Sequence, residues 1–424
     1  MSAMKLTQEE LDILEGKQGE VMAKILKTLV MFGEAMGATD FVPVNNCGHL
    51  VTSFGLKMIT PVYSIMEQLN KAGIKAPYGF TADPRPIDYK NVKANVLEKL
   101  VFSKFMYSKQ NEYEKQLLEA GLKDKDAFTC TCYLDEVGNK PKKGEAIGWA
   151  ESSAVVFANS VLGARCNRNS GMIDLFQSVS CRALNYGFMK EENRKATWII
   201  EVKTTKKPEA QILGSAIGMK VVEEVPYVIG LDKWIGSEIN DGTISYLKDF
   251  GAATASNGAV GLFHIDNLTP EAKEQGKALI KENAKKYVID DAELERVYNS
   301  YPVMWKNKDA KPKLCFIGCP HATLTQLNWW TEEIGKALQA SGKKKVTVRT
   351  VITTSPAVAK VFIQSENYKK LVSYGVKLSN ICPLMYTNNP LEKSKPIITS
   401  SNKLRTYSNA KYQKDSDILQ AITR

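Results

Sequence analysis

The amino-acid sequence predicts an α/β protein of several lobes, in which parallel βαβ units surround a central cleft. The main indication is the last hundred residues, where strand-like KLCFIG, KVTVRTVI and KLSNIC alternate with helical stretches near 324–340 and 356–374. Strands that alternate with helices in this way pair in parallel. Upstream, the strand-like TWIIEVKTT followed by the helical PEAQILGSAIGMKVV repeats the pattern. At 424 residues the chain exceeds the ~250 to 300 residues at which single cores stop growing.

The remaining elements follow from hydrophobic spacing and from breaks at glycine and proline. We expect helices near Thr7–Glu15, Glu20–Ala35, Val62–Ala72 and Asn91–Ala120, and strands at Phe41–Val44 and in AFTCTCYL, at 127–134. Lysine-rich helices are expected up to about Asn299, and KNKDAKPK, at 306–313, is the expected linker. We therefore divide the chain into a main lobe (1–305), a βαβαβ lobe (306–390) and a C-terminal segment (391–424) that returns to the active site.

Composition and charge exclude several classes of protein. Apolar residues make up 44% and charged residues 24%, as in ordinary globular chains, so disorder is not expected. No apolar run reaches the ~18 residues of a membrane span, and the acidic N-terminus differs from a signal peptide, which favours a cytoplasmic protein without membrane contact. The net charge of +11 suits an anionic small substrate. Nucleic acid is not expected as a ligand, because the basic stretches lack interleaved aromatic residues.

Three of the eight cysteines form a candidate metal centre. None of the eight belongs to the paired CxxC arrangement of a zinc ribbon, so any metal site must be assembled by the fold. Cys319 and Cys382 follow two strands of the predicted parallel sheet, whose carboxyl ends gather ligands, and Cys130 lies in TCTCYL. Three thiolates on one iron leave an open coordination position for a Lewis acid. The alternative is that each is a small buried hydrophobic residue.

The stretch 145–171 places polar groups in an apolar helix. Glu151 is the only charged residue between Ala146 and Ala164. A buried carboxylate needs a counter-charge, and Arg165 and Arg168, just downstream, are natural candidates. Asn159 lies eight residues after Glu151, within roughly 80° on a helix, which indicates a site on that face. The alternative is a helix cap at Glu151 or Ser152 followed by a core helix and a polar loop.

The histidines and the absent motifs narrow the chemistry. His321 follows Cys319 by two residues and is expected near a metal or substrate, whereas His49 and His264 are as consistent with structural roles. The sequence has no GxSxG elbow, P-loop or Rossmann glycine fingerprint. Serine-hydrolase, NTPase and dinucleotide chemistry are therefore not expected.

The motifs together resemble the catalytic large subunit of the aconitase X family. The resemblance rests on GWAESSAVVFANSVLGARCNR, TCTCYL, GLFHID, IGCPHATL and the late YSNAKY, and it extends from Leu6 to Tyr412. It implies an aconitase-like catalytic core and a hydro-lyase whose iron centre, held by three cysteines, binds the departing hydroxyl. The iron species differs between members, so either an iron–sulfur cluster or mononuclear iron is expected.

The resemblance also assigns roles to individual residues. It makes Cys130, Cys319 and Cys382 the metal ligands. Catalytic roles fall to Glu151, His321 and Lys411, with the first two as candidates for proton transfer. Substrate contacts are expected from His49, Asn159, Arg165, Asn167, Arg168, Ser408 and Asn409. The arginines suit a carboxylate because a guanidinium binds it through two parallel hydrogen bonds.

A partner and three departures complete the family comparison. The family's small swivelling domain, which supplies the catalytic serine, has no counterpart after Tyr412, so a separate small subunit is expected and the large subunit alone should be inactive. Cys132 stands where proline is usual and Cys166 where threonine is usual, and TADPRP replaces a TTLNP-like loop. If TCTCYL is a strand, Cys132 shares a face with Cys130 and could fill the open metal position.

The expected reaction is dehydration of a small β-hydroxy acid. The family's known substrates are cis-3-hydroxy-L-proline and mevalonate 5-phosphate. We favour cis-3-hydroxy-L-proline from the sequence, because no dense basic cluster or glycine-rich helix start for a phosphate is evident. Mevalonate 5-phosphate is the alternative within the class. An iron-responsive RNA-binding protein and a scaffold with structural zinc are the alternatives from other classes.

Overall fold

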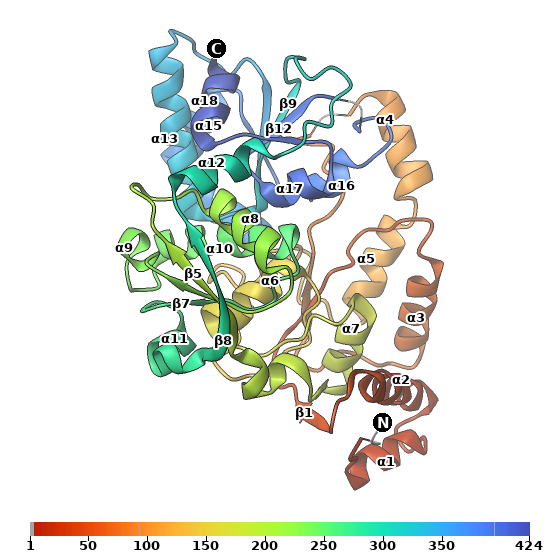
Figure 1. Ribbon diagram of the computed structural model, residues 1–424. Helices are drawn as coiled ribbons and strands as arrows, with labels where there is room; N and C mark the ends of the chain where they lie inside the picture. The colour runs from red at the N-terminus through yellow and green to blue at the C-terminus, as the bar shows by residue number, and fades with distance from the viewer. Residues whose placement is uncertain (1–3, 93, 394) are drawn as a thin grey trace.

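The computed structural model describes residues 4–92, 94–393 and 395–424, and two parallel sheets organise them (Figure 1). The C-terminal sheet has the strand order β11-β10-β9-β12-β13, and every pairing in it is parallel. Its elements are β9 (Leu314–Ala322), α13 (Leu324–Ala340), β10 (Arg349–Thr354), α14 (Pro356–Phe362), α15 (Glu366–Ser373), β11 (Lys377–Ser379), α16 (Pro383–Thr387), β12 (Ile397–Thr399), α17 (Asn402–Tyr407), β13 (Lys411–Tyr412) and α18 (Asp415–Thr423). The predicted βαβαβ succession of elements is observed from β9 to β11, and the same sheet also includes β12 and β13 from the segment 391–424.

The second sheet has the order β7-β6-β5-β8 and is also parallel. Helices α8 and α10 pack closely on each other (Figure 1). The strands of this sheet and the helices between them are β5 (Ala196–Val202), α8 (Ala210–Val221), β6 (Pro226–Ile229), α9 (Asp232–Ile235), α10 (Asp241–Asn257), β7 (His264–Ile265), α11 (Pro270–Gln275), the 3-10 turn η5 (Gly276–Leu279), β8 (Ile280–Ile289) and α12 (Asp291–Asn299). The class predicted from the sequence, mixed α/β with parallel sheets, is therefore correct.

The N-terminal part is mostly helical and carries two short strand pairs, β1 with β4 and β2 with β3. Its elements are α1 (Gln8–Leu14), α2 (Glu20–Met36), β1 (Phe41–Pro43), β2 (Gly48–Leu50), α3 (Thr60–Lys71), β3 (Phe80–Ala82), α4 (Val96–Leu100), the π-helix η1 (Val101–Met106), α5 (Gln110–Glu119), α6 (Ser152–Phe157), the π-helix η2 (Ala158–Leu162), α7 (Gly171–Ser180), β4 (Arg182–Leu184), η3 (Gly187–Met189) and η4 (Glu191–Arg194). The helices predicted at α1, α2 and α3 are confirmed to within two residues at each end.

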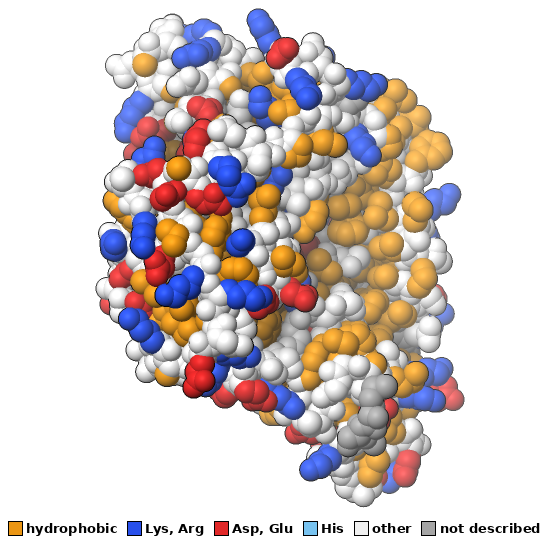
Figure 2. All heavy atoms as spheres, viewed as in Figure 1, with side chains coloured by type: hydrophobic (Ala, Val, Ile, Leu, Met, Phe, Trp, Pro, Cys, Tyr) orange, Lys and Arg blue, Asp and Glu red, His pale blue; other side chains and the backbone are white. Residues whose placement is uncertain are grey.

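The surface is hollowed between the N-terminal helices and the rest of the molecule. Figure 2 shows this hollow on the right of the view, with hydrophobic side chains along it and over the region of α4. One hydrophobic core runs continuously under both large sheets and α6, and a separate core lies among α2, α3, α5 and α7. No helix in the described ranges is long and apolar enough to cross a bilayer.

The strand predicted at 127–134 is wrong. Phe128 makes a single bridge to Ala82 of β3, after which the chain turns. The Thr129 hydroxyl bonds Thr131 at 3.0 Å, and the Leu134 N–H donates to the Thr131 carbonyl at 3.2 Å. Threonine side chains thus bond locally in place of a strand partner. Because there is no strand, period-two alternation does not place Cys130 and Cys132 on one face.

The single helix predicted over 91–120 is broken at residues 107–109. Gly55 packs against the break, where a Cβ on it would lie 2.2 Å from the backbone nitrogen of Gln110. The Gln110 side chain fixes this close approach by accepting from the Gly55 N–H at 2.7 Å and donating to the Ser53 carbonyl at 2.9 Å. The helix is therefore divided into α4 with η1 and a separate α5.

Two further helix predictions were wrong in part. The lysine-rich segment 280–289 is strand β8, because pairing with β5 outweighs the helix propensity of its lysines. Lys285 of β8 lies 2.8 Å from Glu224 and 5.1 Å from the Trp198 ring centroid. The helix predicted over 356–374 is two helices, since the Ser365 hydroxyl accepts from the Tyr368 N–H at 3.2 Å and starts α15 anew.

Candidate active site

Three cysteine thiols from distant segments converge at the carboxyl edge of the C-terminal sheet. Cys319 lies near the end of β9, and Cys382 is the residue before α16. Cys130 lies in the loop that follows the bridge between Phe128 and Ala82 of β3. The Cys130 sulfur accepts a hydrogen bond from the backbone N–H of His321 at 3.4 Å. Cys319 lies close enough to Cys130 and to Cys382 to raise the pKa of each of them.

Burial raises the pKa of all three thiols. It raises the pKa of Cys382 to about 12, and two nearby carboxylates add to its effect at Cys130. At Cys319, burial is opposed by the ammonium of Lys403, which favours the thiolate. Without a bound cation these groups remain protonated at neutral pH, so a metal would bind by displacing their protons.

His321 connects the three segments that carry Cys130, Cys319 and Cys382. Its Nδ1 lies 3.0 Å from the Thr129 hydroxyl, and its Nε2 lies 3.2 Å from the Ile381 carbonyl oxygen. A carbonyl can only accept, so the network assigns the proton to Nε2 and makes the Thr129 hydroxyl the donor to Nδ1. Burial lowers the pKa of His321 to about 4, which keeps the ring neutral. Both nitrogens are occupied, which favours a positioning role over proton transfer.

Glu151 is the N-cap of α6, as in the alternative reading of its sequence. One carboxylate oxygen accepts from the Ala154 N–H at 2.7 Å and from the Ser153 hydroxyl at 2.6 Å, and the other binds the Lys403 ammonium. Both charged side chains are almost fully buried. Burial would raise the pKa of Glu151, but Lys403 and the cap hydrogen bonds lower it to about 2. The pair is therefore ionised at neutral pH.

The prediction that Arg165 or Arg168 pairs with Glu151 is wrong. The helix ends at Gly163, whose φ of 72° turns the chain away. Arg165 then forms an ion pair with Glu191 and donates to the Met189 carbonyl at 2.6 Å. Arg168 has a φ of 53° and lines a cavity of about 250 Å³, and its guanidinium makes no ion pair in the ranges that the structure describes.

The predicted substrate-binding asparagines hold loops together. The Asn159 amide nitrogen donates to the Cys166 and Gly261 carbonyls at 2.9 and 2.8 Å, and its oxygen accepts from the Cys166 N–H. Asn167 donates to the Tyr186 carbonyl at 2.8 Å and accepts from the Phe188 N–H at 2.7 Å. Their hydrogen-bonding groups are thus engaged by the backbone, and their expected substrate contacts stay a prediction.

His49 and Asp83 add a second polar pair beside the thiols. His49 Nδ1 lies 2.9 Å from the Thr81 hydroxyl, and its Nε2 lies 3.4 Å from Asp83 Oδ1. Both of the latter atoms are buried and lack a hydrogen-bond partner of good geometry. Burial raises the pKa of Asp83 to about 6, although His49 opposes the rise. Unsatisfied buried polar atoms of this kind point to a functional site.

Lys403 is the candidate functional residue that the sequence reasoning missed. It is buried, and its pKa is raised by Glu151, Cys319, Cys130 and Asp83 despite the opposing effect of desolvation. It follows β12, whose three residues are too few to show strand periodicity. The rule that ligand-binding groups follow the carboxyl ends of parallel strands would have selected it once β12 was recognised.

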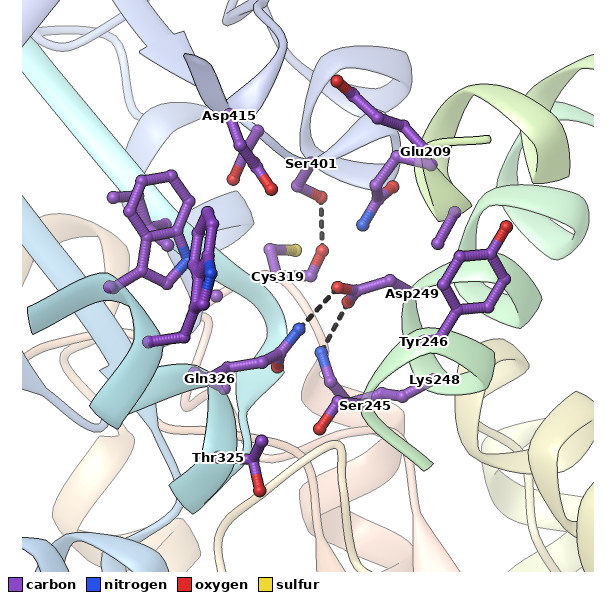
Figure 3. A pocket seen from close by; sticks show the side chains of 18 of the residues that line it. Glu209, Ser245, Tyr246, Lys248, Asp249, Cys319, Thr325, Gln326, Ser401 and Asp415 are labelled. Carbon is purple, nitrogen blue, oxygen red and sulfur yellow. Dashed lines mark hydrogen bonds and ion pairs between the residues drawn. The ribbon is translucent and has the colours of Figure 1, made fainter. Parts of the chain in front are cut away.

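A cavity of about 440 Å³ lies beside Cys319, where α8, α10, α13 and α18 begin (Figure 3). Its wall is partly aromatic and partly acidic, and it includes Tyr246, Trp329 and Trp330 together with the carboxylates of Asp249 and Asp415. Burial, together with neighbouring carboxylates, raises the pKa of Asp415. Cys319 thus lines a cavity that contains three carboxylates together with the ammonium groups of Lys207 and Lys248.

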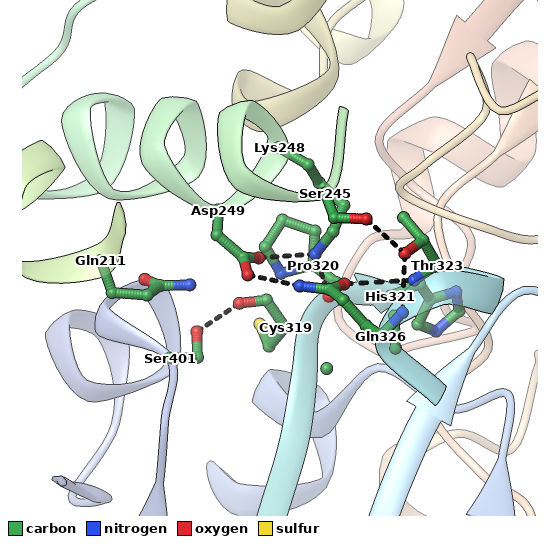
Figure 4. Close-up of polar contacts among 12 residues, drawn as sticks. Gln211, Ser245, Lys248, Asp249, Cys319, Pro320, His321, Thr323, Gln326 and Ser401 are labelled. Atoms are coloured by element: carbon green, nitrogen blue, oxygen red, sulfur yellow. Dashed lines mark hydrogen bonds and ion pairs between the residues drawn. The ribbon is translucent and has the colours of Figure 1, made fainter. Parts of the chain in front are cut away.

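A hydrogen-bonded network supports the end of β9 from this cavity (Figure 4). The buried Lys248 ammonium lies 2.5 Å from the Asp249 carboxylate and 3.3 Å from the Pro320 carbonyl oxygen. The other Asp249 oxygen accepts from Gln326 at 2.7 Å, and the Ser401 hydroxyl donates to the Cys319 carbonyl. The peptide that carries the Cys319 thiol is therefore held from two sides.

The predicted C-terminal site residues lie among loops of the same lobe. The Ser408 hydroxyl donates to the Leu404 carbonyl at 2.6 Å. Asn409 donates to the Lys395 carbonyl at 3.0 Å, and the Lys411 ammonium lies 5.7 Å from the Trp305 ring centroid. These contacts order the turn between α17 and β13, and the predicted catalytic role of Lys411 stays a prediction.

The side chains around the thiols fit an iron centre in their chemistry. Among residues 4–92, 94–393 and 395–424, no three His, Cys, Asp or Glu side chains already form a cage for a metal ion. Three thiols, of which Cys130 and Cys319 are buried and Cys382 is partly buried, are nevertheless donors of the kind that iron takes. The Lys403 ammonium favours the thiolate at Cys319, and Asp83, whose Oδ1 has no hydrogen-bond partner, lies near Cys130 and Cys382. The donor set therefore supports a thiolate-held iron.

Comparison with known proteins gives consistent matches along the chain. Family models for the first, second and third domains of aconitase X match residues 3–192, 196–299 and 312–421. The phosphomevalonate dehydratase large subunit of Thermococcus kodakarensis is 31% identical over 87% of this chain and 86% of its own. That of Methanocaldococcus jannaschii is 30% identical over 95% of both chains.

More distant matches carry a different activity in their names. The cis-3-hydroxy-L-proline dehydratase of Hypocrea jecorina is 28% identical over 67% of this chain and 45% of its own. Among solved structures, the holo-form of Thermococcus kodakaraensis aconitase X superposes with a TM-score of 0.81 and 28% identity, covering 99% of this chain and 100% of the other. The chain thus matches five phosphomevalonate dehydratase large subunits over 75 to 95% of their own length.

Proposed function

Since the chain belongs to the aconitase X family of hydro-lyases, we propose that it is the iron-dependent large subunit of a mevalonate 5-phosphate dehydratase. The choice of substrate is supported by the extent of the match. The alignment covers 95% of the Methanocaldococcus large subunit but 45% of the Hypocrea hydroxyproline enzyme. The proposal replaces the substrate preference drawn from the sequence. The relatives' names also support a separate small subunit, which we propose supplies the catalytic serine.

The chemistry follows from the buried groups. Cys130, Cys319 and Cys382 would hold the iron, which supplies a Lewis acid for the departing hydroxyl when bound. Removal of the proton alpha to the carboxylate by the partner's base forms the double bond as the hydroxyl leaves. Asp83, with a pKa of about 6, gives that hydroxyl the proton with which it departs as water, and His49 orients Asp83.

Replacing Asp83 by asparagine is expected to lower kcat of the reconstituted enzyme by roughly 100-fold or more, because the departing hydroxyl loses its proton donor. In the wild type, kcat/KM should fall as the pH rises through about 6, since the group acts as an acid only when protonated. Asp83→Asn should remove this limb of the pH–rate profile. Asp135→Asn, an exposed carboxylate paired with Lys140, is the control. A variant that keeps both rate and limb would rule out this role.

The substrate is tested by turnover in the two-subunit complex. We expect the complex to dehydrate mevalonate 5-phosphate and each subunit alone to be inactive, as measured by loss of the substrate and appearance of the alkene in NMR spectra. cis-3-Hydroxy-L-proline is the second candidate, because dehydratases of that name match 66 to 67% of the chain. Dehydration of hydroxyproline without turnover of mevalonate 5-phosphate would show that the second candidate is correct.

A further inference from the structure

Five exposed hydrophobic side chains form one patch on the upper rim of the hollow in Figure 2. Val96 and Met58 are 86% and 91% exposed, and Phe105 is 63% exposed, values unusual for side chains of this size. Lys57 is joined to the end of η1 by a hydrogen bond from its N–H to the Met106 carbonyl at 3.0 Å, which brings Met58 beside that helix. We name this surface the α4 patch; it comprises Met58, Val96, Leu97, Leu100 and Phe105.

The charged rim of the patch is basic. Between Lys90 and Lys109 the only acidic residue is Glu98, which is buried and forms an ion pair with Lys395 at 2.8 Å. The exposed Lys99 and Lys104 form no ion pair with any acidic side chain in the described ranges. A complementary surface would therefore be apolar at its centre and carboxylate-rich at its edge.

The inner face of the same helical segment contacts the cysteine site. The Tyr107 hydroxyl donates to the Met385 carbonyl at 3.1 Å, in the helix α16 that begins after Cys382. Phe102 packs on Tyr386 of α16 with ring centroids 5.9 Å apart. One short segment thus has its outer face exposed at the rim and its inner face against the helix that follows a proposed metal ligand.

We infer that the α4 patch is the docking surface for the small subunit, which binds it through an apolar centre and an acidic edge. This inference rests on the proposed function, since it assumes a separate small subunit. The exposed patch adjoins the hollow, and its reverse side supports α16, so a partner seated there stands beside the proposed iron ligands. Docking would also order α16 through Phe102 and Tyr107.

The test is binding of the small subunit from the same organism, a chain of ~130 residues that resembles a swivelling domain. Leu97→Glu combined with Phe105→Glu should weaken its binding to the anaerobically purified large subunit by at least tenfold in calorimetry. Lys99→Glu with Lys104→Glu should weaken it too and flatten its dependence on salt. Met219→Glu, at a half-exposed apolar residue of α8, is the matched control and should bind as the wild type.

The outcomes separate the two proposals. Visible absorption and melting temperature of each isolated variant show that fold and metal centre are intact. Patch variants that are folded yet bind the small subunit as the wild type does would overturn the docking inference. A wild-type chain that binds no small subunit would overturn the proposed function as well. If the patch substitutions instead abolish self-association of the large subunit, the surface joins two copies of this chain, and the inference is wrong.

Discussion

Substituting alanine for Cys130, Cys319 or Cys382 is expected to abolish dehydration by the two-subunit enzyme, with kcat at least ~1,000-fold lower in each case. Each substitution removes Cys319 or one of the two thiols whose pKa Cys319 raises, and the remaining two cannot hold the metal in the same open geometry. The measurement is turnover together with the visible absorption of the large subunit. We expect activity and absorption to be lost together.

Cys315→Ala provides a matched control. Cys315 is buried in the same strand as Cys319, four residues earlier, and its pKa is raised by burial, with Asp415 as a lesser cause. Its loss should cost some stability through a small cavity but leave absorption and kcat unchanged. If Cys315→Ala loses the absorption and Cys319→Ala keeps it, the assignment of the three ligands is wrong.

Lys403→Met is expected to destabilise the fold by about 3 to 5 kcal/mol and to lower kcat by about 100-fold or more. The substitution leaves the Glu151 carboxylate buried without its counter-charge. In the wild type the low pKa of Glu151, about 2, contributes stability above pH 4.5 that is lost as the pH falls toward 2. In the variant, desolvation dominates and raises the pKa of Glu151. The decrease in the free energy of unfolding relative to the wild type should therefore be largest at pH 7 and smaller at pH 4.5. Urea unfolding at both values measures it.

A second substitution distinguishes charge from packing. Lys403→Met with Glu151→Gln removes both charges and should recover part of the stability without recovering activity. Lys414→Met breaks a more exposed ion pair with Glu295 and should cost less than about 1 kcal/mol. A double variant no more stable than Lys403→Met would show that the buried charge is not the cause.

The sequence predicted the parallel architecture because regular alternation of strands and helices is a local signal. Residues 324–340 form α13 as predicted, since the apolar spacing is helical and Thr323 and Gln326 provide a capping box. The loop around Cys130 escaped prediction because TCTC alternates like a strand, whereas its threonines bond each other and His321. Lysine-rich β8 escaped because its pairing with β5 is a tertiary contact.

The candidate site was predictable only in part. The family resemblance and the carboxyl-end rule selected the three cysteines, of which Cys319 lies near the end of β9 and Cys382 follows β11 of the same parallel sheet. The partner of Glu151 was not predictable, because Lys403 lies 252 residues away and no spacing rule joins them. Arg165 was the first cation downstream in sequence, but the turn at Gly163 directs it to Glu191. Local distance along the chain is therefore a poor guide to partners of a buried charge.

The most direct test of the account is the metal content of the wild-type chain purified without oxygen, measured with its visible absorption spectrum. We predict iron bound in proportion to protein, with thiolate or sulfide charge-transfer bands. A colourless chain that contains zinc, or no metal, would contradict the iron-dependent dehydratase and favour a structural zinc scaffold on the same cysteines.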